Sequence, residues 1–175
     1  VYKTFNIDKV LPLIEYGHID FGENKVQEAI DKWTEIKKKN LKIKLHMIGK
    51  LQTNKVKYAV KLFDYIHSVD SEKMAKKIAD EQLKINKRIK IFIQVNIGDE
   101  DQKSGIKKND IDKLITYCKE INLDLIGLMC IPPANIDPAH YFKQMKQLNK
   151  NFDFRELSMG MSSDYLKAVK NLSTY

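Results

Sequence analysis

The sequence has few of the features that would place it in several large classes of protein. Its two cysteines, Cys118 and Cys130, are spaced neither as zinc ligands nor as a disulfide framework, so we expect two buried or half-buried thiols. No apolar run approaches the roughly 18–20 residues of a membrane span, and no leader peptide precedes the first candidate strand. We therefore expect a cytoplasmic protein with no membrane partner.

Arginine is almost absent, and lysine supplies the positive charge. The formal net charge is +8, and the only arginines are Arg88 and Arg155. Recognition of nucleic acids usually relies on the bidentate guanidinium of arginine. The lysines fall instead on candidate helix faces and between elements, as in Lys37-Lys38-Lys39. We therefore expect a solvated basic surface and no nucleic-acid partner, and keep a basic nucleic-acid-binding α/β domain as a minor alternative.

Short apolar runs alternate with amphipathic stretches along the chain. The runs predict strands at residues 1–5, 19–23, 43–49, 65–69, 89–97, 123–131 and 156–161, each followed by a segment of helical periodicity. Several runs are almost continuously apolar, as parallel strands covered on both faces are. The first helix should cover residues 11–16, starting late because Pro12 fits only a first turn, and should stop at Gly17.

Repeated strand–helix units predict an α/β fold with a parallel sheet. An open doubly wound sheet and a (β/α)8 TIM-type barrel both fit this order, and the absence of a dinucleotide-binding glycine fingerprint favours the barrel. Such a barrel typically needs about 250 residues, although about 200 can suffice. We therefore expect one domain over residues 1–175, an incomplete barrel truncated at both ends that lacks part of strand 1 and all of strand 8.

Barrel proteins place their sites at the carboxyl ends of the strands, so the candidate residues are sought there. Lys3 closes the first strand, where desolvation would favour attack of its amine on a carbonyl; from this residue alone, an exposed lysine is the better interpretation. Asn24 follows the second strand as a ligand donor, a helix N-cap or both. His46, on the third strand, is either a polar site residue or a satisfied core histidine.

Two further segments could hold an anion. Lys103 lies in a polar, glycine-containing loop after the fifth strand, a candidate lid or an ordinary solvent loop. Ser158, Met159 and Ser162 lie on and after the seventh strand, where free amides, hydroxyls and the positive end of a helix favour a phosphate. An ordinary serine N-cap fits the same residues, so the local pattern leaves both interpretations open.

Seven motifs, in the same order along the chain, resemble the family of pyridoxal 5′-phosphate (PLP) homeostasis proteins, also called the YggS or PROSC group. The motifs are Val1-Tyr2-Lys3-Thr4, Asp20-Phe21-Gly22-Glu23-Asn24, His46-Met47-Ile48-Gly49, Ile66-His67-Ser68-Val69-Asp70-Ser71, Gln94-Val95-Asn96-Ile97, Gly127-Leu128-Met129-Cys130-Ile131-Pro132 and Leu157-Ser158-Met159-Gly160-Met161-Ser162-Ser163-Asp164. The family shares the barrel of the alanine racemase N-terminal domain. This sequence departs from it at Tyr2, usually serine, and lacks the Arg-Ile-Gly-type eighth strand that supplies the partner of the pyridine nitrogen.

The resemblance implies a specific cofactor site. Lys3 would carry PLP as a Schiff base, Asn24 would lie beside the pyridine ring, and Ser162 would hold the phosphate. Ile48 and Met159 would flank the ring, with His46 and Ser158 nearby.

The resemblance also implies a PLP carrier without established catalysis, and we expect a monomer. Such a protein would serve vitamin B6 homeostasis and could pass PLP to PLP-dependent apoenzymes. A PLP-dependent enzyme of the alanine racemase type is the alternative.

Overall fold

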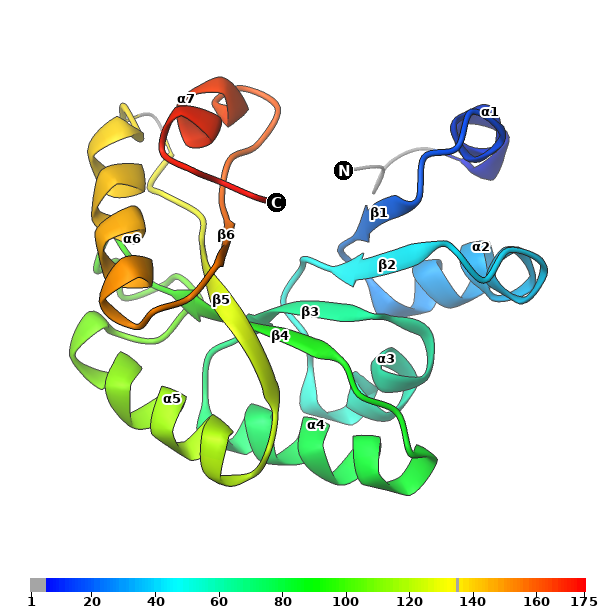
Figure 1. The fold of residues 1–175 in the computed structure, drawn as a ribbon, viewed down its shortest axis with the longest axis horizontal. Helices are drawn as coiled ribbons and strands as arrows, with labels where there is room; N and C mark the ends of the chain where they lie inside the picture. The colour runs from blue at the N-terminus through cyan, green and yellow to red at the C-terminus, as the bar shows by residue number, and fades with distance from the viewer. Residues whose placement is uncertain (1–5, 135) are drawn as a thin grey trace.

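Six parallel strands form one curled sheet in the computed structural model, which describes residues 6–134 and 136–175 (Figure 1). The strands are β1 (Asp20–Glu23), β2 (Lys44–Met47), β3 (Tyr65–Val69), β4 (Lys90–Val95), β5 (Asp124–Cys130) and β6 (Glu156–Ser158). Each strand pairs only with its neighbours in the chain, so the sheet runs β1-β2-β3-β4-β5-β6. A doubly wound sheet reverses its order at a switch point, whereas a barrel does not. The prediction of an incomplete barrel is confirmed.

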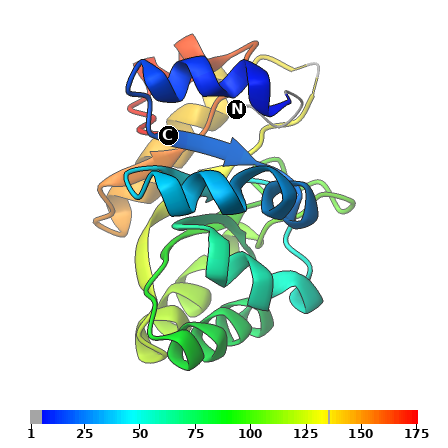
Figure 2. The same cartoon turned by 90° about the vertical axis from the view of Figure 1, so that its right-hand side faces the viewer.

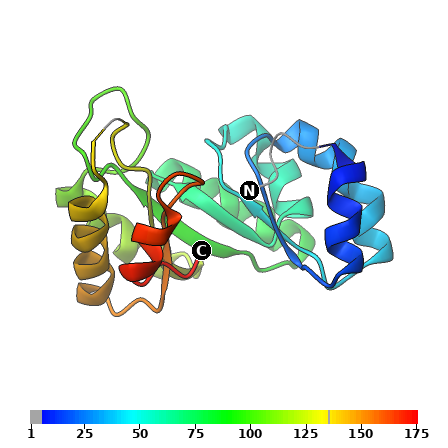
Figure 3. The ribbon, with the colours of Figure 1, turned by 90° about the horizontal axis from the view of Figure 1, so that it is seen from above.

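Helix α1 precedes β1, a helix follows each of the six strands, and the helices cover the convex side of the sheet (Figures 1 and 3). They are α1 (Ile7–Glu15), α2 (Val26–Lys39), α3 (Val56–Leu62), α4 (Glu72–Ile85), α5 (Ile111–Glu120), α6 (Ala139–Asn151) and α7 (Tyr165–Lys170). Short 3-10 turns precede α3 and α5, at Thr53–Lys55 and Lys108–Asp110. No helix in the described ranges is both long and apolar enough to cross a membrane.

Side-chain alternation along the strands separates two apolar clusters. Leu45 and Met47 of β2 belong to the large cluster that includes the buried faces of the helices, whereas His46 between them points to the concave side. The small cluster consists of Tyr65, Phe92 and Met129, with Ile126 packed against it. The concave side of the sheet is therefore the interior of the barrel, and it is lined by both aromatic and polar side chains.

The chain beyond α7 returns to the sheet beside β6. The Tyr175 N–H donates to the Leu157 carbonyl at 3.2 Å, and the Tyr175 carbonyl accepts from the Met159 N–H at 3.1 Å. This is the hydrogen-bond pattern expected of a next parallel strand. The final described residues thus occupy the position that follows β6 in a barrel.

The first helix differs from its prediction. Helix α1 begins at Ile7 and holds Pro12 in its interior rather than in its first turn, and it lies beside β1 (Figure 2). Proline costs the helix one hydrogen bond, but the helix buries Val10 fully and packs Leu13 against the core, which outweighs that loss. The predicted end is confirmed, since Gly17 has φ +96° and its N–H donates to the Ile14 carbonyl.

The last β/α unit is also shorter than predicted. Strand β6 ends at Ser158 rather than at residue 161, and α7 begins at Tyr165 with Asp164, not a serine, at its N-cap position. The Asp164 carboxylate accepts a hydrogen bond from the Met161 N–H, which closes a turn before the helix. Ser162 and Ser163 are therefore part of a turn that precedes a six-residue helix.

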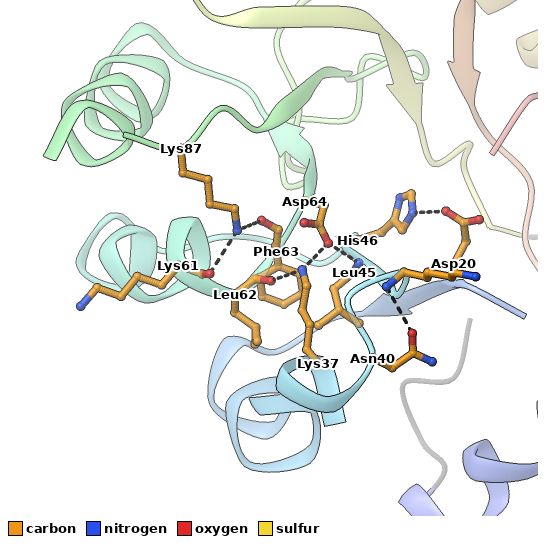
Figure 4. A network of polar contacts seen from close by, with 11 residues as sticks. Asp20, Lys37, Asn40, Leu45, His46, Lys61, Leu62, Phe63, Asp64 and Lys87 are labelled. Carbon is orange, nitrogen blue, oxygen red and sulfur yellow. Dashed lines mark hydrogen bonds and ion pairs between the residues drawn. The ribbon is translucent and has the colours of Figure 1, made fainter. Parts of the chain in front are cut away.

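Two lysines close the C-terminal end of α3 at the amino ends of the strands (Figure 4). Lys87 donates to the carbonyls of Lys61 (3.1 Å) and Phe63 (2.8 Å). Lys37 donates to the Leu62 carbonyl and forms an ion pair with Asp64. Burial lowers the pKa of Lys87 to about 8. Cations at these carbonyls stabilise the helix, because they interact favourably with the negative end of its dipole.

The Lys87→Met substitution should destabilise the protein by about 1–2 kcal/mol, because two carbonyls lose their donor while the aliphatic packing is kept. Urea unfolding followed by circular dichroism measures the change. The matched control is Lys84→Met, three residues earlier on α4, whose amine is exposed and bonds within that helix to Glu81; it should cost less than about 0.5 kcal/mol. Equal losses in the two variants would contradict the capping role.

Candidate functional site

The carboxyl ends of β1, β2 and β6 form one rim at the mouth of the barrel. Asn24 directly follows β1, Ile48 directly follows β2, and Ser158 is the last residue of β6. Because all strands are parallel, these residues share one edge of the sheet, as the sequence predicted. Lys3, the predicted Schiff-base residue, lies outside the described residues.

Glycines bring two of these strand ends into close contact. A Cβ atom on Gly49 would lie 2.2 Å from the Asn24 carbonyl oxygen, so the chain after β2 packs directly on the chain after β1. A Cβ on Gly22 would lie 3.3 Å from Cδ1 of Ile48, which places Ile48 over the end of β1. The close backbone approach that Gly49 permits is therefore made by Asn24, and it brings Asn24 and Ile48 together.

The rim on β6 combines a buried and an exposed part. Ser158 and Met159 are buried, and Met159 belongs to the large apolar cluster. Gly160 then adopts φ +96° and packs against Ala168 of α7, where a Cβ would lie only 2.7 Å from the alanine methyl. Ser162 is exposed beyond this bend. Its hydroxyl is thus accessible to a ligand, while Ser158 faces the barrel interior.

A chain of four polar side chains crosses the barrel interior. The Asp20 carboxylate lies 3.0 Å from Nε2 of His46, and Nδ1 of His46 lies 3.0 Å from Nε2 of His67. Nδ1 of His67 then lies 2.8 Å from the Ser158 hydroxyl. The imidazoles and the serine are buried, whereas the Asp20 side chain is 42% exposed. These residues come from β1, β2, β3 and β6, and we call them the Asp–His–His–Ser chain.

Aromatic rings enclose the two imidazoles. His46 stacks on Tyr65 with ring centroids 4.1 Å apart, and His67 stacks on Phe92 at 4.3 Å. Tyr175 contacts both imidazoles, at 5.3 and 5.8 Å. Of the two interpretations open for His46, a satisfied interior histidine describes its contacts in the structure.

Burial holds both imidazoles in their neutral forms. It lowers the pKa of His46, although the hydrogen bond to Asp20 opposes the shift. It lowers the pKa of His67 well below its ordinary value, and the neighbouring His46 adds to the effect. Neutral imidazoles each carry one donor and one acceptor, which is what a continuous chain of hydrogen bonds requires.

The free energy of unfolding should therefore fall as the pH drops below 6.5, the ordinary pKa of both histidines. In that range the unfolded chain binds protons that the folded chain excludes, at up to about 1.4 kcal/mol per pH unit for each imidazole. Urea titrations between about pH 7.5 and 5 measure the slope, and His67→Gln should flatten it. If the free energy of unfolding changed equally with pH in the wild type and in His67→Gln, the burial of His67 as a neutral imidazole would be contradicted.

Other chemical groups have structural roles or lie elsewhere. The amine of Lys103 pairs with Glu100 at 2.6 Å, so in this structure the predicted anion-seeking lysine holds its own loop. Cys118 and Cys130 are buried, as predicted, and burial raises the pKa of each thiol to about 12. The described residues contain no cluster of side chains suited to a metal ion.

A cavity of about 570 Å³ opens at the amino ends of the strands, away from the rim, and is lined in part by Lys42, Lys44, Arg88 and Lys90. Conserved chemistry in barrels belongs to the opposite end, so we place the site at the rim.

The sequence did not predict three members of the barrel interior. His67, Tyr65 and Tyr175 meet there because β3 and the residues after α7 face each other across the curled sheet. The available signal was the alternation in β2 and β3, which puts His46 on the face opposite Leu45 and Met47, and His67 on the face opposite Ile66. The contact between His67 and Ser158, 91 residues apart, has no local signal.

The sequential parallel sheet, with polar groups gathered at its carboxyl rim, defines a TIM-type barrel whose candidate site lies at its mouth. The family model described as alanine racemase, N-terminal domain, matches residues 2–174. The pyridoxal phosphate homeostasis protein of Aquifex aeolicus is 36% identical, covering 98% of this chain and 79% of that protein, and that of Pasteurella multocida is 34% identical, covering 99% and 79%.

Solved structures agree with this result. PipY of Synechococcus elongatus with PLP bound is 30% identical with a TM-score of 0.90, and the match covers 98% of this chain and 84% of PipY. Alanine racemase of Clostridium difficile, 13% identical with a TM-score of 0.70, shares the fold over 93% of this chain and 44% of its own. The chain belongs to the alanine racemase N-terminal domain family, among its pyridoxal phosphate homeostasis proteins.

Proposed function

We propose that this protein binds PLP as a Schiff base on Lys3 and serves PLP homeostasis, with residues 1–175 acting as one barrel domain. The observation that carries the proposal is the match to PipY, whose structure holds PLP, over 98% of this chain. When bound, PLP supplies a reactive aldehyde that lysine amines capture reversibly. Holding that aldehyde on one amine keeps it from other amines until it is passed on.

The rim residues fit such a ligand. The exposed hydroxyl of Ser162 and the turn amides before α7 suit a phosphate, because serine hydroxyls and free N–H groups are its usual donors. Asn24 is half-buried after β1, where its amide can lie beside a pyridine ring, and Ile48 lies over the end of the same strand. Met159 is the second proposed neighbour of the ring, although its side chain packs in the large apolar cluster with the helices. Ser158 faces the same interior from β6, and His46 acts on it through His67.

A carrier fits these residues better than an enzyme does. Turnover of an amino acid requires a second acid or base aimed at the substrate. In this structure the two interior histidines are bonded to each other and to Asp20 and Ser158. The likeness to alanine racemase, at 13% identity, is one of fold. We propose a monomeric cytoplasmic carrier whose recipients are PLP-dependent apoenzymes.

The test is incubation with PLP followed by absorbance, borohydride reduction and peptide mapping. The proposal expects a Schiff-base band and a single reduced adduct at Lys3. No band, or adducts spread over many surface lysines, would overturn it. Racemisation of an amino acid at enzyme-like rates of about 1 per second or more would favour the racemase alternative. Salt-sensitive DNA binding without PLP binding would favour the nucleic-acid alternative.

A further inference from the structure

The hydrogen bonds of the Asp–His–His–Ser chain have a fixed direction when both imidazoles are neutral. A carboxylate only accepts, so Nε2 of His46 carries the proton shared with Asp20. Nδ1 of His46 is then an acceptor, and Nε2 of His67 must donate to it. Nδ1 of His67 in turn accepts from the Ser158 hydroxyl. All three hydrogen bonds point toward Asp20, and the Ser158 proton is committed to His67.

One additional proton changes the direction of the chain. With His46 protonated on both nitrogens, its Nδ1–H donates to Nε2 of His67, so the single proton of His67 sits on Nδ1. That N–H donates to the oxygen of Ser158, whose own O–H is released from the chain. The number of protons is conserved when the one taken up is counted. Before uptake, three protons occupy the three hydrogen bonds. After uptake there are four protons: three occupy the same hydrogen bonds, and the fourth, on the Ser158 hydroxyl, points away from the chain.

The released hydroxyl lies where the proposed ligand binds. Ser158 is the last residue of β6, four residues before the exposed Ser162. We propose that the Asp–His–His–Ser chain couples PLP binding to the uptake of one proton, because only the proton-loaded chain frees the Ser158 hydroxyl to donate to the cofactor. This inference rests on the proposed function and adds to it a regulation of the same site: release of PLP is favoured as the pH rises.

The surroundings keep the free protein in the proton-poor state. Burial disfavours a charged imidazole at both positions. Charged groups also act on His46 from neighbouring strand ends: Asp20 and Asp64 favour its cation, and Lys44 opposes it. Tyr65 and Tyr175 face the imidazoles as rings, and burial and the hydrogen bond with Tyr65 raise the pKa of Tyr175, with smaller contributions from Glu156 and Asp20. An anionic ligand at Ser158 stabilises the Asp–His–His–Ser chain when it carries the additional proton, which the free protein does not do.

The first experiment needs no ligand. Nitrogen-15 correlation spectra of the histidine side chains report which ring nitrogen carries the proton. At about pH 7.5 we expect both His46 and His67 as Nε2–H tautomers, which change together, with one apparent pKa, on acidification. His140→Gln, an exposed position on α6, serves for assignment and should leave both signals unchanged. An Nδ1–H tautomer of either residue, or independent titrations, would overturn the directed chain.

The second experiment counts protons. Calorimetric titration with PLP in buffers of different ionisation enthalpy gives the protons taken up, and wild type should take up about one more than Ser158→Ala. The Kd of the wild type for PLP should also rise with pH more steeply than the Kd of Ser158→Ala, by up to about tenfold per pH unit. Asp20→Asn should reduce the uptake while leaving β6 intact.

The outcomes of the two experiments are separable. Equal proton counts in wild type and Ser158→Ala, with PLP bound to both, would overturn the coupling and leave the proposed function standing. Failure of the wild type to bind PLP would overturn the proposed function and the coupling together, and the tautomers would still report the direction of the chain.

Discussion

Lys3→Ala should abolish the Schiff-base band and weaken PLP binding by on the order of 100-fold, or about 2.7 kcal/mol. The rim can hold the phosphate and the ring without this amine, but only a lysine amine forms the covalent bond to the aldehyde. Absorbance titration measures the band, and equilibrium dialysis measures what remains bound. Residual binding by the variant is therefore expected, and it should depend on Ser162.

The matched control for Lys3→Ala is Lys146→Ala, which removes an exposed amine from α6. It should leave the band and the affinity unchanged, since PLP reacts only weakly with a solvated, protonated lysine. A band that survives in Lys3→Ala would assign the Schiff base to another lysine. The resemblance of the motif Val1-Tyr2-Lys3-Thr4 to the PLP homeostasis proteins would then no longer support Lys3 as the Schiff-base residue.

Gly127→Ala should destabilise the protein by at least about 3 kcal/mol, a large part of the 5–15 kcal/mol typical of a domain. Gly127 on β5 pairs with Glu156 on β6, and a Cβ atom there would lie 1.9 Å from the Glu156 carbonyl oxygen. The obstacle is backbone, so relief requires β6 to move away. Urea unfolding followed by circular dichroism tests this, and PLP binding should weaken as well because β6 carries Ser158.

Gly17→Ala provides the comparison for this glycine. Gly17 has φ +96° but nothing within 4 Å of its added Cβ, so the substitution meets strain without a collision. We expect a loss of about 1 kcal/mol, the usual cost of placing alanine in this conformation. Similar losses at the two positions would contradict the collision at Gly127, because they would show that β6 moves away from an added Cβ at little cost.

Strand positions followed from the sequence because they are local properties. An apolar run such as residues 89–97 predicts a buried strand, and alternating strands and helices predict a parallel sheet. The sequential strand order followed less directly, since it rested on the absence of a dinucleotide-binding glycine fingerprint, which favoured the barrel over a doubly wound sheet. The helix around Pro12 was not predicted correctly, because burial of Val10 and Leu13 decides it and a propensity rule does not include burial.

The candidate site was predictable only in outline. The rule that barrel sites lie at strand ends placed Asn24, Ile48 and Ser158 on one rim. The hydrogen bond between His67 and Ser158 depends instead on how strongly the sheet curls and on the register between strands, which no local pattern encodes. The role of Lys3 came from the resemblance, since a lysine near a strand end is ordinarily a solvated one.

The strictly sequential pairing of β1 to β6 also bears on how the chain folds. Each strand meets a partner that lies one helix away, so every loop closed during folding is short and costs little entropy. Any adjacent pair can nucleate, and further β/α units can add at either side, much as units add in repeat proteins. The Asp–His–His–Ser chain, which joins β3 to β6, can form only after the intervening units are in place, so its completion marks the end of assembly rather than its start.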